Sequence, residues 1–186
     1  MMALFIPEHK AVFIRVPKTG STAVLTRFCE GQGGHVPAAR LRDRIGRDRW
    51  PDWFSFAFVR NPWDRVVSAW YYLRFSLPVV PEQMSFTDFV ATRTFLQAWT
   101  GSHFHQLPYL VDGAGAIIVS FIGRYEHLQR DVDRISARLD LPCSTLRRSG
   151  SARPPGDTYR HHYTDETRRV VAGECRADIE AFGYTF

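Results

Sequence analysis

Short apolar runs and amphipathic stretches alternate along this chain. Apolar residues, many of them β-branched or aromatic, are nearly continuous over residues 11–16, 54–59 and 116–122, which is typical of buried strands. Elsewhere they recur every three or four positions, which predicts helices over residues 21–30, 38–45, 64–74, 85–99, 128–139 and 164–182. This alternation predicts an α/β fold in which a parallel β-sheet is flanked by helices. No internal repeat or domain boundary is visible, so we expect a single domain over residues 1–186.

The composition is that of a folded protein whose positive charge is almost all arginine. Hydrophobic residues make up 45% of the chain, which argues against disorder. Lys and Arg number 24 against 19 Asp and Glu, and only Lys10 and Lys18 are lysines. The planar guanidinium group suits bidentate binding of phosphate or sulfate. High-GC coding explains most of these arginines equally well.

The cysteines and the N-terminus indicate a cytoplasmic protein. Cys29, Cys143 and Cys175 are odd in number and far apart, which disfavours a disulfide framework or a structural zinc site and fits a reducing compartment. The apolar start of the chain is too short for a signal peptide, and no stretch approaches the ~18 apolar residues of a membrane span. We therefore expect no stable membrane insertion.

The first candidate site lies where the first predicted strand gives way to a helix. Residues 17–22, here called the first turn, read PKTGST. A lysine, a glycine that permits close backbone approach and two hydroxyls at a helix start are what a bound oxyanion requires. The pattern differs from a Walker A loop, because Lys18 precedes Gly20 instead of following the glycines. We interpret it as a cradle for phosphate or phosphosulfate; an ordinary strand–helix turn with a solvated lysine is the alternative.

The second candidate site follows the second predicted strand in the same way. Residues 59–62, here called the second turn, read VRNP, and a helix that carries Ser68 follows them. Arg60 stands at the carboxyl end of its strand, where ligands of open α/β sheets bind. A surface ion pair for Arg60 and a serine tolerated in the middle of a helix for Ser68 are the alternative. Two anion-binding turns together suggest a ligand with two anionic ends.

Together, these motifs resemble the sulfotransferases that use 3′-phosphoadenosine 5′-phosphosulfate, in particular the carbohydrate branch that includes heparan sulfate 2-O-sulfotransferase. That family has a strand–PKTG(S/T)(S/T)–helix loop and a VR(N/D)P-x-(D/E)R-x-x-S helix, matched here by residues 17–22 and 59–68. Further similarity lies in residues 122–126 (IGRYE), 163–166 (YTDE) and 182–184 (FGY). The resemblance spans nearly the whole chain and implies a P-loop-NTPase-like sulfotransferase fold.

The resemblance also implies an activity and a set of site residues. It implies transfer of a sulfuryl group from the nucleotide donor to a hydroxyl or amine, without a metal. The acceptor would be a glycan, a glycolipid or a small molecule. Lys18 would stabilise the leaving phosphate. The residues implied for the nucleotide are Pro17, Lys18, Thr19, Gly20, Ser21, Thr22, Arg60 and Ser68, with Arg153 from the loop at residues 142–160.

A histidine between the two turns is the candidate general base. His35 lies in a Gly-His-Val segment that resembles the one in the 2-O-sulfotransferase branch, where a histidine is proposed as base. Imidazole titrates near neutral pH and suits this task. An exposed or structural histidine is the alternative. The pairs His103/His105 and His161/His162 lack a carboxylate or cysteine at ligand spacing, so we expect no metal site.

Three other functions compete with sulfuryl transfer. A non-catalytic module that binds nucleotides or sulfated glycans would keep the two turns without a working base. A P-loop kinase is disfavoured by the absence of GxxxxGK[ST]. A nucleic-acid binder is disfavoured because the arginines are scattered and no nucleic-acid motif accompanies them.

Overall fold

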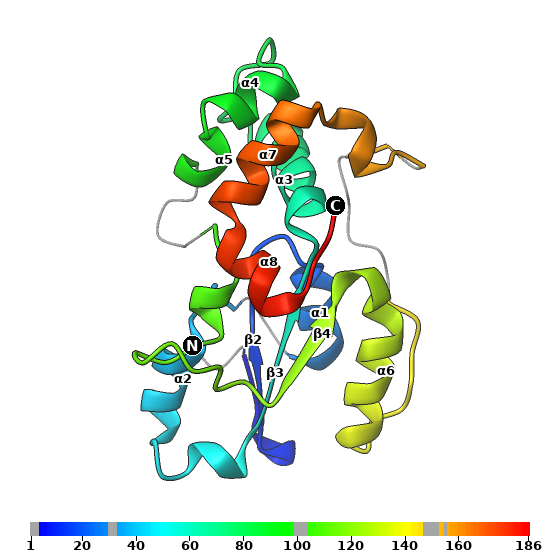
Figure 1. The fold of residues 1–186 in the computed structure, drawn as a ribbon. Helices are drawn as coiled ribbons and strands as arrows, with labels where there is room; N and C mark the ends of the chain where they lie inside the picture. Colours follow the sequence, from blue (N-terminus) through cyan, green and yellow to red (C-terminus); the bar gives the residue numbers. More distant parts are fainter. Residues whose placement is uncertain (1–3, 30–32, 99–103, 147–152, 155) are drawn as a thin grey trace. The chain divides into compact units, whose positions relative to one another are not determined.

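The computed structural model describes residues 4–29, 33–98, 104–146, 153–154 and 156–186. These residues form two compact units (Figure 1). The first contains the described residues of 1–59 and 106–149, and the second contains those of 60–105 and 150–186. The chain therefore passes between the units after residues 59, 105 and 149. The expectation of a single domain stays a prediction.

The first unit is built on a mixed four-stranded sheet with the order β1-β2-β3-β4. The central pairs β2–β3 and β3–β4 are parallel, as expected, whereas β1 is antiparallel to β2. The prediction of a parallel sheet is thus corrected at one edge. A two-residue strand is too short to leave a periodic signal in the sequence. The strands are β1 (Phe5–Ile6), β2 (Ala11–Ile14), β3 (Phe54–Val59) and β4 (Phe121–Arg124).

The register of the parallel strands brings their carboxyl ends to one edge of the sheet. Ala11 lies opposite Phe54, and Ile14 lies opposite Ala57. Because neighbouring parallel strands run the same way, β2 enters the first turn at the edge where β3 ends. Arg60 is the residue that follows β3.

Helices α1 (Ser21–Phe28), α2 (Ala38–Ile45) and α6 (Leu128–Arg138) belong to the first unit, together with short 3₁₀ turns at Pro7–His9, Trp50–Asp52, Leu107–Tyr109 and Tyr125–His127. Aromatic rings fill the space between α1 and the sheet. Phe56 stacks on Phe13 at 5.2 Å between centroids and meets Phe28 of α1 edge-on at 5.6 Å. Val132 and Ile135 of α6 are buried, and α6 packs against β4.

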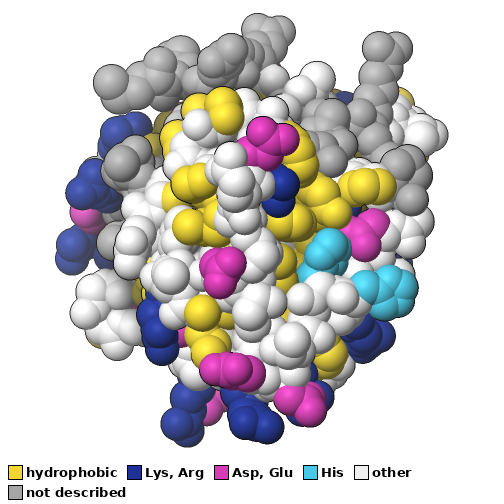
Figure 2. Space-filling view, turned by 90° about the horizontal axis from the view of Figure 1, so that it is seen from above, with side chains coloured by type: hydrophobic (Ala, Val, Ile, Leu, Met, Phe, Trp, Pro, Cys, Tyr) yellow, Lys and Arg dark blue, Asp and Glu magenta, His cyan; other side chains and the backbone are white. Residues whose placement is uncertain are grey.

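The second unit is helical over its described residues. It consists of α3 (Pro62–Tyr71), a π-helical turn (Tyr72–Ser76), α4 (Phe86–Ala91), α5 (Thr94–Gln97), a 3₁₀ turn (Tyr159–His162), α7 (Asp165–Glu174) and α8 (Arg176–Phe182). Apolar residues of α3, α4, α5 and α7 form its core. Figure 2 looks down on this unit and shows hydrophobic side chains gathered on its surface.

Three predicted elements differ from the observed ones by more than a few residues at their ends. The strand expected at 116–122 is β4 at Phe121–Arg124, and Ile117 makes only an isolated bridge to Val111. The helix expected at 85–99 is broken at Arg93, which has a left-handed φ of 55°. The helix expected at 164–182 is divided at Cys175 into α7 and α8. In the two helices the apolar periodicity continues through the break, so the sequence pattern gives no sign of it.

A close contact in the sheet yields a stability prediction. Gly123 of β4 lies opposite Phe58, and a Cβ at this position would come within 2.5 Å of the Phe58 ring. Gly123→Ala should therefore lower the free energy of unfolding by about 1–3 kcal/mol, the usual cost of overpacking a core. Urea unfolding measures this loss. Gly113→Ala is the matched control, because nothing lies within 4 Å of the added Cβ there; equal stability of the two variants would contradict the packing argument.

Candidate functional site

The backbone of the first turn bends sharply through two residues in the left-handed conformation. Lys18 and Gly20 both have left-handed backbone angles, with φ of 62° and 74°. The buried Thr19 between them donates a hydrogen bond from Oγ1 to the carbonyl of Val16 at 3.0 Å. A Cβ on Gly20 would lie 2.9 Å from Cδ2 of Leu128, so the position has no room for a side chain. The chain therefore turns sharply and enters α1 directly.

The start of α1 has no side-chain cap. Gly20 is its N-cap residue and offers no side-chain acceptor to the first N–H groups of the helix. These groups carry a partial positive charge, and an anion is one of the partners that can satisfy them where a cap is missing. The first turn thus combines backbone donors, the hydroxyls of Ser21 and Thr22, and the half-buried ammonium of Lys18.

Arg15, which the sequence analysis missed, lies across this helix start. Its Nε donates to Ser21 Oγ at 3.3 Å, and one of its terminal nitrogens donates to Thr22 Oγ1 at 3.2 Å. The other terminal nitrogen donates to the carbonyl of Gly33. The guanidinium therefore adds a second cation to the first turn and fixes both hydroxyls. The available signal was an arginine that interrupts an apolar strand run just before Pro17.

His35 lies beside the backbone of Arg15. Its Nδ1 is 2.8 Å from the carbonyl oxygen of Arg15. A carbonyl only accepts hydrogen bonds, so Nδ1 carries the hydrogen and, in the neutral ring, Nε2 carries the lone pair. The half-buried imidazole is thus held in the tautomer in which Nε2 can take up a proton.

The second turn is fixed by Asn61 and Pro62. Asn61 Oδ1 accepts a hydrogen bond from the backbone N–H of Trp63 at 3.1 Å and so caps α3, and Pro62 occupies the first helical position. The amide nitrogen of Asn61 donates to the carbonyl of Thr185 at 2.8 Å, which ties the C-terminal residues to this turn. The start of α3 is therefore capped by protein, unlike that of α1.

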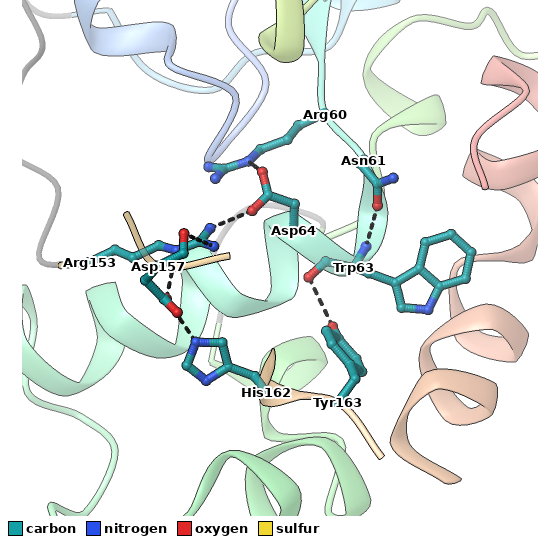
Figure 3. Close-up of polar contacts among 8 residues, drawn as sticks. All are labelled: Arg60, Asn61, Trp63, Asp64, Arg153, Asp157, His162 and Tyr163. Carbon is teal, nitrogen blue, oxygen red and sulfur yellow. Dashed lines mark hydrogen bonds and ion pairs between the residues drawn. The ribbon is translucent and has the colours of Figure 1, made fainter. Parts of the chain in front are cut away.

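A chain of alternating charges extends from Arg60 (Figure 3). Arg60 Nε donates to Asp64 Oδ2 at 2.7 Å, and a terminal nitrogen of Arg153 donates to Asp64 Oδ1 at 2.5 Å. Arg153 Nε donates to Asp157 Oδ2 at 2.8 Å, and the same carboxylate oxygen lies 2.8 Å from His162 Nε2. These five residues are called the arginine–carboxylate network below. Their side chains are 7–17% exposed, so solvent screens the charges weakly.

The shifts in pKa follow from this arrangement. Burial opposes ionisation of Asp157, but hydrogen bonds from His162 and Arg153 outweigh it and lower the pKa of this carboxyl. Burial likewise disfavours the charged form of Arg153, yet Asp64 and Asp157 raise its pKa. Burial, followed by the nearby charge of Asp157, raises the pKa of Tyr71. The Asp157 carboxyl is therefore ionised at neutral pH and holds the guanidinium group of Arg153 in place.

Ser68 lies on the face of α3 that carries this network. It stands four residues after Asp64, and positions i and i+4 share one side of a helix. It is half-buried. Of the predicted residues, Arg60 and Arg153 are thus joined through Asp64, and Ser68 lies one helical turn further along.

Several members of the network were not assigned a role from the sequence. The pairs Arg60/Asp64 and Arg153/Asp157 have the i,i+4 spacing of ion pairs, which was a readable signal. The contact between Arg153 and Asp64 spans 89 positions and leaves no local trace. Of the paired histidines considered above for a metal site, His103 lies outside the described residues.

The second unit also has a surface hollow. It has a volume of about 500 Å³ and is lined by residues 74–75 and 78–82. Phe75, Leu77 and Val79 are exposed large hydrophobic residues in the same stretch, with Phe75 56% exposed. Exposed apolar clusters of this kind are typical of binding surfaces.

Within the described part of the chain, no group of three or more His, Cys, Asp or Glu side chains is placed to hold a metal ion. No helix in that part is both long enough and apolar enough to cross a membrane. Burial raises the pKa of Cys29 to about 11 and that of Cys175 to about 12, so both thiols stay protonated at neutral pH.

Comparison with known proteins identifies relatives of this chain. The family model described as "Sulfotransferase family" matches residues 1–185. A protein of Archaeoglobus fulgidus described as "Uncharacterized protein" is 33% identical over 110 residues, which cover 58% of this chain and 84% of the relative. No solved structure matches the chain.

The position of Asp64 between two arginines yields a second stability prediction. Asp64→Asn removes the charge that compensates both guanidinium groups in a weakly solvated site, and should lower the free energy of unfolding by about 2–4 kcal/mol. Asp43→Asn is the matched control, since Asp43 and Arg47 form an exposed i,i+4 pair at 3.1 Å. That change should cost less than about 0.5 kcal/mol. Similar urea midpoints for the two variants would show that Asp64 contributes no more to stability than an exposed carboxylate does.

Proposed function

Because the chain belongs to the sulfotransferase family, we propose that it transfers a sulfuryl group from 3′-phosphoadenosine 5′-phosphosulfate to an acceptor hydroxyl or amine. The observation that carries the proposal is the first turn. It presents an uncapped helix start, two hydroxyls and two cations to one anionic group. These groups fit a phosphosulfate, because each is a hydrogen-bond donor or a positive charge.

We assign the two ends of the nucleotide to the two turns. The 5′-phosphosulfate is proposed to bind Pro17, Lys18, Thr19, Gly20, Ser21 and Thr22. The 3′-phosphate is proposed to bind Arg60 and Ser68, with Arg153 as a further ligand. The fixed orientation of Arg60 and Arg153 by Asp64 supports this assignment, because preorganised guanidinium groups lose little freedom when an anion binds.

The donor supplies an activated sulfur–oxygen bond, and the residues of this chain would do the rest. The acceptor oxygen forms a new bond to sulfur as the bond from sulfur to the phosphate oxygen breaks. Lys18 would stabilise the negative charge that develops on this phosphate oxygen. His35 Nε2 would take the acceptor proton, in the tautomer that the Arg15 carbonyl imposes.

The acceptor is proposed to be a glycan, a glycolipid or a small molecule. The exposed apolar side chains of Phe75, Leu77 and Val79, at or beside the hollow, support acceptors with an apolar part, such as a glycolipid or an aromatic alcohol, over a uniformly polar polysaccharide. A panel of all three acceptor classes with donor radiolabelled in its sulfuryl group tests the activity directly. Transfer of label to any acceptor supports an enzyme. Donor binding without transfer across the panel would favour the non-catalytic nucleotide- or sulfated-glycan-binding module.

The two lysines of the chain provide a matched pair for a kinetic test. Both have left-handed backbone angles, so replacement of either by alanine changes the backbone preference in the same way. Lys18→Ala should lower kcat by about 10²–10³-fold, the usual loss when one charge-stabilising group is removed, with a much smaller change in nucleotide affinity. The exposed Lys10→Ala variant should keep wild-type kinetics. A Lys18 variant with weaker binding and unchanged kcat would restrict Lys18 to binding of the ground state.

The role of His35 is tested by its pH dependence. His35→Ala should keep nucleotide affinity and lose about 10²–10⁴-fold in kcat, the usual contribution of a positioned base. The acidic limb of the pH–rate profile, along which the wild-type base becomes protonated, should disappear in this variant. His127→Ala replaces an exposed histidine and is the control. Near-normal turnover of the His35 variant would assign the base to another group.

A further inference from the structure

The charges of the arginine–carboxylate network are balanced when His162 is neutral. Arg60 and Arg153 contribute two positive charges, and Asp64 and Asp157 contribute two negative ones. A phosphate that approaches these arginines therefore meets cations whose charge is already compensated. One further positive charge is available inside the network, on the imidazole of His162.

His162 is held firmly in its place. Asp157 Oδ2 accepts hydrogen bonds only, so His162 Nε2 carries a hydrogen in either protonation state. The ring also packs among the rings of Trp70, Tyr71 and Phe86, at centroid distances of 5.5–5.8 Å. The side chain is 17% exposed.

The bond from His162 continues to Arg153. Asp157 binds Arg153 twice, through its carboxylate at 2.8 Å and through its backbone carbonyl at 2.7 Å. His162 is therefore a partner of the carboxylate that orients Arg153. Tyr71 also faces this carboxylate, because its hydroxyl interacts with Asp157, and the charge of Arg74 acts on Tyr71.

We infer that His162, acting through Asp157, is a positioning residue for Arg153, and that anion binding at Arg60 and Arg153 draws a proton onto His162. The inference rests on the proposed function in taking the 3′-phosphate as the anion. A negative ligand favours the protonated imidazole, so affinity and protonation are linked. Binding should therefore be accompanied by proton uptake between about pH 6 and 8, where imidazole groups change charge.

Two substitutions separate the positioning of Arg153 from the charge of His162. His162→Gln keeps an N–H donor for Asp157 but cannot gain a proton. His162→Ala removes both the donor and the charge. His161 is the exposed neighbour of His162, and His161→Gln is the matched control.

The experiment is calorimetric titration with adenosine 3′,5′-bisphosphate in buffers of different ionisation enthalpy, which counts the protons taken up on binding. The wild-type protein and H161Q should take up a fraction of a proton near neutral pH that is absent in H162Q. At high pH, above the range in which imidazole groups change charge, H162Q should bind like the wild type, and H162A should bind several-fold more weakly. The intrinsic protonation of the ligand phosphate is common to all variants and cancels in the comparison.

The outcomes distinguish this inference from the proposed function. Wild-type proton uptake that persists in H162Q, or equal affinities of H162A and H162Q at high pH, would overturn the inference and leave the proposed function standing. A wild-type protein that does not bind the bisphosphate would overturn both. Thermal unfolding of each variant shows whether a weaker affinity reflects loss of fold; if H162A does not fold, the comparison of H162Q with H161Q still decides the inference.

Discussion

The parallel pairing of β2 with β3 is the constraint on which the candidate chemistry depends. The register of this pairing brings the carboxyl ends of both strands to the same edge of the sheet. That edge therefore carries the first turn, which follows β2, and Val59, which ends β3 and precedes Arg60. Aromatic side chains pack on this pairing, among them the stacked pair Phe13 and Phe56. Since a slip of one residue would turn these rings to the opposite face, the packing of the rings protects the register. The aromatic packing on β2 and β3 therefore both stabilises the sheet and fixes the position of the first turn.

The two candidate turns differ in how the first backbone N–H groups of the following helix are capped. At α1 the N-cap residue has no side chain, and cations and hydroxyls gather around the helix start. At α3 the amide of Asn61 caps the helix, and its cations are already paired with carboxylates. An incoming anion would thus complete the first turn, whereas at the second it would compete with an existing carboxylate for the arginines. The difference explains why proton linkage is expected only at the second.

Much of the fold could be predicted because buried strands and amphipathic helices leave a strong periodic signal. β3 lies where its apolar run predicted it, and α6 differs from its predicted range only at the last residue. β4 was displaced because residues 116–119 are as apolar as a strand, and their location depends on a bridge to Val111 that no local pattern encodes. The family and the two turns were readable, since motifs of this kind are local in sequence.

The rest of the candidate site could not be read from the sequence, because it depends on tertiary contacts. The partner of Arg153 at Asp64 is remote along the chain, and the partner of His35 is a backbone carbonyl, which has no identity in the sequence at all. Sequence patterns report side chains and their spacing. They report neither which main-chain atom a side chain meets nor which of two adjacent histidines is buried.

The backbone contact of His35 has a consequence for how this protein can change over evolutionary time. Every amino acid at position 15 supplies the same carbonyl oxygen, so the proton on Nδ1 of His35 stays in place whichever residue occurs there. The guanidinium of Arg15, in contrast, is lost with most substitutions, and its hold on Ser21 and Thr22 is lost with it. Position 15 therefore contributes a side-chain contact, which mutation can remove, and a backbone contact, which persists as long as the main chain keeps its path. Drift at this position can alter the grip of the first turn on an anion while the tautomer of the histidine persists.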